Sequence, residues 1–205
     1  MRSETMYRLS VLLCVSLMAL AGCSNERLDR LETDAIILAF GDSLTAGVGS
    51  EEGYSYPEVL ADLTQLNVIS SGVPGEVSEQ GAPRLAQELR RVRPDLLILL
   101  HGGNDILRNR PLTELKANLD AMIGMAQSRG AQVVLIAVPE KKLFSDAAPF
   151  YEELAEQHDL VLIDELLAEL LRDPAMKSDA VHLNAAGYRA LAEGVHAVLR
   201  DEGAL

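Results

Sequence analysis

Basic residues are scarce in this chain: its 205 residues include 18 Lys and Arg against 31 Asp and Glu, which gives a formal net charge of −13. The basic side chains are scattered or lie near acidic ones in the sequence. A surface that binds nucleic acid concentrates positive charge on one face, so we expect no nucleic-acid partner. The charge balance instead predicts an acidic surface.

Cysteines and clustered metal ligands are also scarce. The two cysteines, Cys14 and Cys23, both lie near the start of the chain, so we expect no disulfide framework in the remainder. No group of His and Cys residues has the spacing of a metal site, and the glycines after the first apolar segment do not form the Gly-x-Gly-x-x-Gly pattern of dinucleotide-binding domains. We therefore expect no cofactor, and a nucleotide-binding domain is disfavoured.

The first 22 residues have the features of an export signal. Arg2 and Arg8 precede an apolar run at residues 9–20 that is short for a membrane span, and Leu20-Ala21-Gly22-Cys23 follows. This arrangement resembles a bacterial lipoprotein signal, which is cleaved before a cysteine that carries lipid. A plain signal peptide, or a membrane anchor with an incidental cysteine, is the alternative.

The resemblance implies that residues 1–22 are removed and that Cys23 is lipidated. The polar residues 23–34 would then form a tether between the lipid and the folded domain. We expect the protein to be lipid-anchored to a membrane of the cell envelope, on the periplasmic side. Ser24 after the cysteine favours the outer membrane if the host is Gram-negative.

Residues 35–205 are expected to form one globular domain, since the sequence is 48% hydrophobic and shows no repeats. Short apolar runs alternate with segments in which apolar residues recur at helical spacing. This alternation predicts a three-layer α/β/α sandwich with a five-stranded parallel sheet. The expected strands are residues 35–40, 67–69, 96–100, 133–138 and 160–163, and the expected helices are residues 54–66, 82–93, 112–129, 149–158, 166–172 and 185–200.

A hydroxyl group lies in the turn after the first expected strand, in the stretch Gly41-Asp42-Ser43-Leu44. Parallel sheets bind their ligands at the carboxyl ends of the strands, which makes Ser43 a candidate nucleophile. Asp and Ser are also common turn formers and helix N-caps, and the stretch alone does not decide between these interpretations.

A candidate base for that serine lies just before the last expected helix. Asp179 and His182 are three residues apart, so one tight turn brings the carboxylate against one ring nitrogen and leaves the other free. A histidine held in this way takes a proton from a serine in many hydrolases. A solvated histidine in a surface turn is the alternative for this pair taken alone.

Acyl transfer also needs hydrogen-bond donors for the oxyanion. The backbone N–H groups of Ser43 and Gly75 and the side-chain amide of Asn104 follow the first, second and third expected strands. Their loops would meet at one edge of a parallel sheet. Each loop also has the ordinary composition of a turn.

Together these motifs resemble the four sequence blocks of the SGNH hydrolases, also called GDSL esterases and lipases. The matching stretches are Gly41-Asp42-Ser43-Leu44, Gly75, Gly102-Gly103-Asn104-Asp105 and Asp179-x-x-His182. The resemblance implies a flavodoxin-like fold and a serine ester or thioester hydrolase of the arylesterase, thioesterase or lysophospholipase type. It implies Ser43, His182 and Asp179 as the catalytic triad, Ser43, Gly75 and Asn104 as the oxyanion hole, and a small ester or lysolipid as substrate.

The chain departs from the family pattern at several positions. Ser70-Ser71-Gly72 replaces a usual Asn-Ala-Gly, and Gly75-Glu76-Val77 replaces Gly-Asp-Thr. His101 stands where an apolar residue or glycine is usual, and is either a core or solvated histidine or a substrate contact. Leu183 replaces the proline that often follows the catalytic histidine. Asp42 and Asp105 are expected to be structural, as acceptors for loop backbone groups.

Two other functions fit parts of the sequence: deacetylation of envelope carbohydrate, and binding of an acyl or acetylated glycan ligand without hydrolysis. Residues 139–149, which include Lys141, Lys142 and Phe144, are expected to border the pocket or to form a solvated loop. The sequence predicts neither the acyl-chain length nor the oligomeric state.

Overall fold

In a computed structural model, which describes residues 26–140 and 148–205, five parallel strands form one sheet in the order β2-β1-β3-β4-β5. All four neighbouring pairs run parallel, so the predicted five-stranded parallel sheet is confirmed. The strands are β1 (Ile36–Gly41), β2 (Asn67–Gly72), β3 (Leu96–Leu100), β4 (Gln132–Ile136) and β5 (Val161–Ile163).

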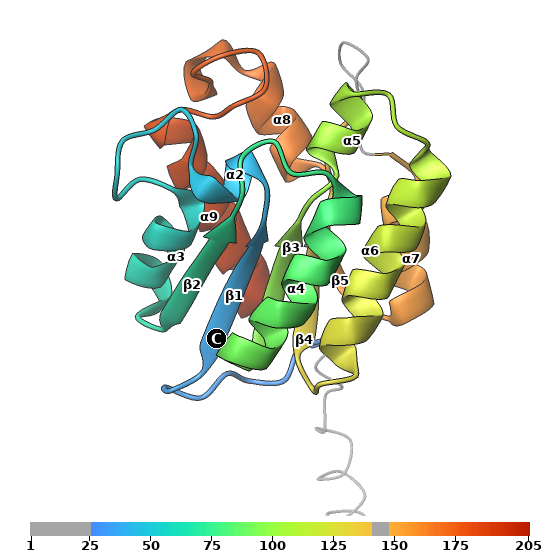
Figure 1. Cartoon of the computed structure of the whole chain (residues 1–205). Coiled ribbons are helices and arrows are strands. Elements are labelled where there is room, and N and C mark those ends of the chain that lie inside the picture. The colour runs from blue at the N-terminus through green and yellow to red at the C-terminus, as the bar shows by residue number, and fades with distance from the viewer. Residues whose placement is uncertain (1–25, 141–147) are drawn as a thin grey trace, which may run out of the picture.

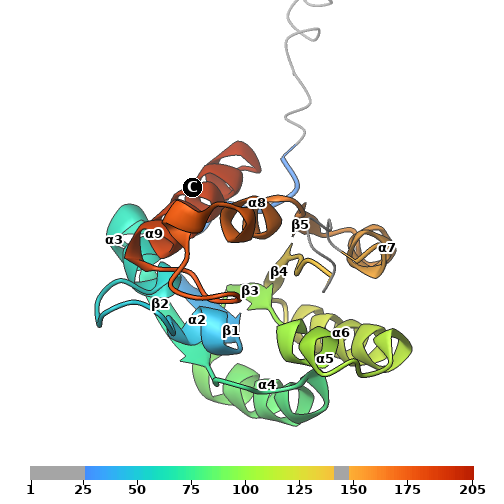
Figure 2. The same ribbon diagram turned by 90° about the horizontal axis from the view of Figure 1, so that it is seen from above.

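Helices cover both faces of the sheet, which gives the predicted three layers (Figures 1 and 2). One face carries α3 and α9, with α8 beside α9, and the other carries α4 and α6, with α7 beside α6. These helices are α3 (Tyr56–Thr64), α4 (Ser78–Val92), α6 (Leu112–Gln127), α7 (Phe150–His158), α8 (Leu166–Arg172) and α9 (Ala185–Asp201).

The central strands are buried because they are covered on both faces. All five residues of β3, Leu-Leu-Ile-Leu-Leu, are fully buried, and residues 37–40 of β1 have no exposed surface either. Each such side chain contributes about 1.5–3 kcal/mol through burial. The continuous apolar runs in the sequence therefore correspond to the strands that need cover on both sides.

The structure differs from the predicted elements mainly at the loops after β1, β2 and β3. Two short helices, α2 (Ser43–Ala46) and α5 (Gly103–Leu107), lie where loops were expected, and a 3-10 turn, η1 (Pro174–Met176), precedes α9. Helix α4 begins four residues before the expected Ala82 and contains Pro83. Its start is fixed from a distance, since the Asp105 carboxylate accepts hydrogen bonds from Ser78 N (2.8 Å) and Ser78 Oγ (2.8 Å).

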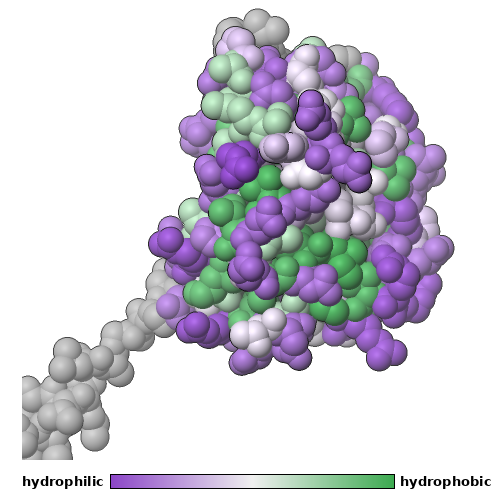
Figure 3. Space-filling view, turned by 90° about the vertical axis from the view of Figure 1, so that its left-hand side faces the viewer, coloured by the Kyte–Doolittle hydropathy of each residue, from purple (hydrophilic) through white to green (hydrophobic). Residues whose placement is uncertain are grey.

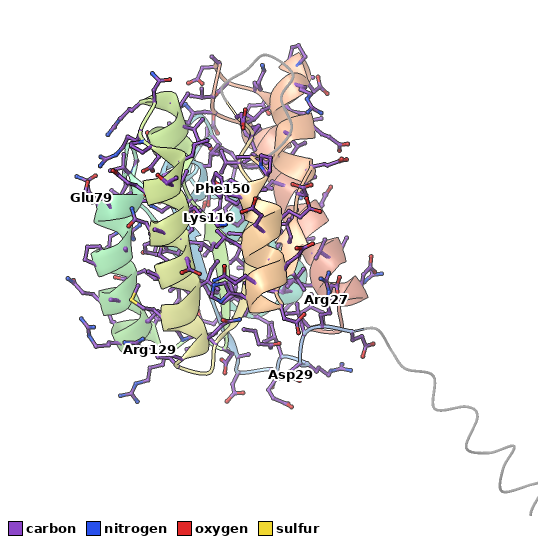
Figure 4. All side chains as sticks on the ribbon, turned by 90° about the vertical axis from the view of Figure 1, so that its right-hand side faces the viewer. Arg27, Asp29, Glu79, Lys116, Arg129 and Phe150 are labelled. Carbon is purple, nitrogen blue, oxygen red and sulfur yellow. The ribbon has the colours of Figure 1, made fainter. Side chains whose placement is uncertain are left out.

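The segment before β1 is docked on the domain. Leu28 N and Leu31 N donate to the carbonyl oxygens of Glu202 and Ala204, and both leucine side chains are buried. Arg27 forms a two-pronged ion pair with Glu202. The folded domain thus includes residues that the sequence assigned to the tether. Figure 4 shows Arg27 at the end of the domain where α6 finishes near Arg129, with Glu79 of α4 toward the other end.

Strand β2, at one edge of the sheet, contains no fully buried residue, unlike the other four strands. Figure 3 shows this side, where apolar surface lies among polar groups. Leu63 of α3 is 36% exposed, and Val68 and Ile69 of β2 are half-buried. In the described parts of the chain no helix combines the length and the hydrophobicity that a membrane span needs.

Candidate active site

The predicted site residues meet at the carboxyl ends of the strands, at the top of the molecule in Figure 1. A cleft of about 660 Å³ opens there, and Ser43, Gly75, Asn104 and His182 all line it. Four stretches of chain that are remote in sequence therefore converge on one cavity, because parallel strands all end at the same edge.

Ser43 is the first residue of α2, directly after β1. The Asp42 carboxylate caps this helix by accepting a hydrogen bond from Leu44 N (3.1 Å), and Gly47 ends it in the left-handed conformation (φ 79°). The serine side chain is thereby held on a turn between a buried strand and a one-turn helix. Asp42 is structural, as predicted.

His182 is held by Asp179 in a tight turn. Its Nδ1 lies 2.7 Å from Asp179 Oδ2, while Asp179 Oδ1 accepts from the backbone N–H groups of Val181 (2.8 Å) and His182 (2.9 Å). The hydrogen bond with the His182 side chain, assisted by these backbone donors, lowers the pKa of Asp179 to about 2. The carboxylate is therefore ionised at neutral pH. More than half of its side chain is exposed to solvent.

The other ring nitrogen of the histidine points to the serine: His182 Nε2 lies 3.1 Å from Ser43 Oγ. With Nδ1 donating to the Asp179 carboxylate, Nε2 carries the lone pair and accepts the serine hydroxyl proton. The three residues form a continuous hydrogen-bonded chain from carboxylate to hydroxyl. That arrangement suits removal of a proton from the hydroxyl as it attacks an electrophile.

Three residues with potential donors line the cleft: Ser43 and Gly75, with their backbone N–H groups, and Asn104, with its side-chain amide. Gly75 has φ +77°, a conformation that favours glycine, and its carbonyl accepts a hydrogen bond from Arg108 Nη2 (2.9 Å). Asn104 Nδ2 donates to Asp42 Oδ2 (3.1 Å), which fixes the amide and leaves its second proton available. Within the described residues, the N–H groups of Ser43 and Gly75 have no hydrogen-bond acceptor.

Asp42 therefore has two partners from different loops. It is nearly fully buried, and this burial raises its pKa above the usual range for an aspartate, although nearby His101, Leu44 N–H and the Asn104 amide all oppose the change. The buried carboxylate links the serine turn to the loop that carries Asn104.

The remaining sequence predictions about this region have mixed outcomes. Asp105 accepts backbone and side-chain hydrogen bonds from Ser78, which confirms its structural role. His101 is fully buried and does not line the cleft, so it is a core residue and not a substrate contact. Cys23 and the stretch with Lys141, Lys142 and Phe144 lie outside the described residues.

Much of the cleft wall was not predicted from the sequence. Ile106 and Leu107 come from α5, and Ala168 and Leu171 come from α8, so apolar side chains dominate two sides of the cavity. The helical period of α8 was visible, but its position over the site depends on how the chain packs after β5. In residues 26–140 and 148–205, no three His, Cys, Asp or Glu side chains are grouped as metal ligands.

Comparisons with known proteins found similar sequences. Residues 39–190 match the family model described as "GDSL-like Lipase/Acylhydrolase family". An arylesterase of Vibrio mimicus is 33% identical over 157 residues, which cover 71% of this chain and 78% of the relative. The thioesterase 1/protease 1/lysophospholipase L1 of Escherichia coli K12 is 28% identical, with 72% and 75% covered.

The fold also matches a solved structure. The crystal structure of AlinE4, described as an SGNH-hydrolase family esterase, superposes with a TM-score of 0.64 at 28% sequence identity. The match covers 83% of this chain and 97% of AlinE4.

Proposed function

This chain belongs to the GDSL-like lipase/acylhydrolase family and is a serine ester hydrolase of the SGNH type, and from that premise we propose that it acts through an acyl-enzyme on Ser43. The observation that carries the proposal is the hydrogen-bonded chain Asp179–His182–Ser43, which ends in a cleft beside three donors.

In the first half of the reaction, Ser43 Oγ attacks the acyl carbon while His182 Nε2 takes the hydroxyl proton. The carbonyl oxygen becomes an oxyanion, which accepts hydrogen bonds from Ser43 N–H, Gly75 N–H and the Asn104 amide. Asp179 stabilises the imidazolium that forms. When the tetrahedral intermediate collapses, the bond to the leaving group breaks and the alcohol or thiol departs with the proton from His182.

The second half reverses these roles. Water attacks the acyl carbon of the acyl-enzyme, and His182 Nε2 accepts its proton. The same three donors hold the second oxyanion. Collapse then breaks the bond to Ser43 Oγ, which regains its proton as the carboxylic acid is released.

The substrate proposed is a small ester, a thioester or a lysolipid. Two of the similar proteins are an arylesterase and a thioesterase 1/protease 1/lysophospholipase L1. The apolar wall formed by Leu107 and Leu171 suits an acyl or aryl group, while Lys177 adds a positive charge to the lining.

Hydrolysis of p-nitrophenyl esters from acetyl to dodecanoyl by the full-length chain tests the mechanism. We expect Ser43→Ala to lower kcat by three orders of magnitude or more, and Asp179→Asn to lower it by about 10³–10⁴, because the asparagine favours the wrong histidine tautomer. Ser128→Ala, a remote hydroxyl deletion at the end of α6, is the matched control. Near-normal turnover by folded Ser43→Ala would refute the acyl-enzyme.

We also propose that the protein is anchored in the cell envelope through lipid on Cys23. The support is the signal-like sequence of residues 1–22. Cys23→Ala should move the protein from the membrane fraction to the aqueous fraction and abolish the mass of the attached lipid. Cys14→Ala, within the apolar run at residues 9–20, is the matched control and should change neither the fraction nor the mass. Equal behaviour of the two variants would reject lipidation at Cys23.

A further inference from the structure

We propose that Arg84 and Glu76 are positioning residues that fix the three oxyanion donors relative to one another. This inference rests on the proposed oxyanion hole. Neither residue lines the cleft. They lie behind it, between α4 and the ends of β1 and β2, and join the loops that carry the donors.

Arg84 uses all of its guanidinium nitrogens. Nε and Nη2 donate to the two carboxylate oxygens of Glu76 (2.7 and 2.6 Å). Nη2 also donates to Gly41 O (3.0 Å), and Nη1 donates to the backbone oxygen (3.2 Å) and hydroxyl (2.6 Å) of Ser71. The guanidinium carbon, Cζ, lies over the Phe40 ring, 3.9 Å from its centroid. One side chain thus bonds the ends of two strands and the second loop at once.

Glu76 extends this network to the third loop. Its Oε2 lies 3.1 Å from Nε2 of His101, which is fully buried at the end of β3. The His101 ring is stacked with Phe40, and its backbone oxygen accepts from the hydroxyl of Tyr151 (2.8 Å). Because His101 Nδ1 has no partner within the described residues, Nε2 carries the proton and donates it to the carboxylate.

Each end of the network lies next to one oxyanion donor in the chain. Gly41, bound by Arg84, is two residues before Ser43. Glu76 directly follows Gly75, and His101 is three residues before Asn104. A displacement of the Arg84–Glu76 pair would therefore move all three donors relative to one another. Among the described residues, the hydrogen bond between Asn104 and Asp42, by comparison, joins two of these loops.

The side chains of Ser71, Glu76 and His101 all belong to the cluster around Arg84. Glu76 contacts both Arg84 and His101, so its carboxylate joins the second loop to the third. These residues therefore form one connected set of supports for the oxyanion loops.

The first experiment separates positioning from folding. Arg84→Lys keeps the positive charge but loses the planar guanidinium that donates to both carboxylate oxygens of Glu76. We expect it to lower kcat for p-nitrophenyl butyrate about 10–100-fold, with KM changed less than about threefold. The double variant Arg84→Met/Glu76→Gln, which leaves no unpaired buried charge, should do the same. Arg27→Met, which breaks the other two-pronged Arg–Glu pair at the far end of the domain, should leave kcat unchanged.

The second experiment asks whether Arg84 acts through the oxyanion hole. Asn104→Ala alone should lower kcat by about 10²–10³. Because Arg84 is proposed to position Asn104 together with the Ser43 and Gly75 donors, adding Arg84→Lys to Asn104→Ala should lower kcat further, but by less than the product of the two single effects. Full multiplication would overturn the proposal, as would wild-type kcat in folded Arg84 variants.

The outcomes also distinguish this inference from the proposed function. Loss of activity in Ser43→Ala and Asn104→Ala with normal Arg84 variants would reject the positioning role alone. Retained activity in Asn104→Ala would reject the oxyanion hole itself. If neither Arg84→Lys nor the double variant folds, the pair is a requirement of the fold and a separable positioning role is rejected.

Discussion

At the scale of single residues, Glu76 is an unusually strong acid for a side chain with so little exposed surface. Its burial would by itself raise the pKa, but the hydrogen bonds from His101 and Arg84, together with the positive charge of Arg84, lower the pKa to about 2. Because the folded-state pKa lies below that of the unfolded chain, ionised Glu76 stabilises the fold at neutral pH. This contribution disappears as the pH falls from about 4.5 toward 2.

Replacing Glu76 should therefore change how stability depends on pH. Wild-type protein is expected to lose about 1–3 kcal/mol of unfolding free energy through this one group between pH 6 and pH 3. Glu76→Gln should be less stable at pH 6 but should lose correspondingly less on acidification. Urea unfolding at the two pH values measures this difference.

The matched control is Glu79→Gln, which lies three residues further along and whose side chain is 68% exposed. Its slope of stability against pH should stay close to that of the wild type. Parallel slopes for wild type and Glu76→Gln would show that Glu76 is not the strong acid described here.

The residues that face the cleft were predictable because their signals are local. Ser43, Gly75 and Asn104 each follow an apolar run, and Asp179 and His182 are three residues apart, so strand ends and one turn were enough to bring them together. Arg84 gave no such signal. Its contact with Gly41 spans 43 residues and exists only because α4 packs across the end of β1.

At the scale of elements, α4 packs closely at Gly81 against His101, the residue that follows β3. A Cβ atom there would lie 2.5 Å from Nε2 of His101, which is a steric clash. Because His101 is fully buried, its ring or the helix would have to shift to remove the clash. The helix was predicted to start at Ala82, because Leu85, Leu89 and Val92 recur at helical spacing from there on. The additional turn forms because Asp105 holds Ser78 from another loop, which no local pattern reveals.

Two glycine-to-alanine changes test this packing. Gly81→Ala should destabilise the protein by about 1–3 kcal/mol, because the steric conflict exceeds the gain in helix propensity. Gly124→Ala in α6, where a Cβ atom meets no other atom within 4 Å, should stabilise it by about 0.5–1 kcal/mol. Equal effects in chemical denaturation would show that the approach of α4 to His101 is not tight.

At the scale of the whole molecule, the first described residues pack against the last residues of the chain. Leu28 and Leu31 are buried beside the end of α9, and the Asp29 backbone bonds the side chain of Gln132 at the start of β4. The sequence placed these residues in a polar tether because charged residues surround the two leucines. Their burial depends on the last residues of the chain, more than 170 positions away.

Removing both leucines should lower stability without affecting catalysis. We expect Leu28→Ala/Leu31→Ala in the full-length chain to cost about 2–4 kcal/mol and to lower Tm by about 5–10 °C, with kcat at 25 °C unchanged. Leu112→Ala, at a position 41% exposed, is the control and should shift Tm much less. An unchanged Tm in the double variant would mean that the docked segment adds nothing to the fold.

The docking of residues 27–34 also fixes where the chain enters the domain relative to the cleft. The chain enters the domain beside the amino end of β1, and the cleft opens beyond the carboxyl end of that strand, six residues or about 20 Å away. If the residues before Glu26 held the protein at a membrane surface, the opening of the cleft would therefore face away from that membrane. The cleft would then be accessible to esters in solution or on an opposing surface, and less accessible to lipids of the membrane that anchors the protein.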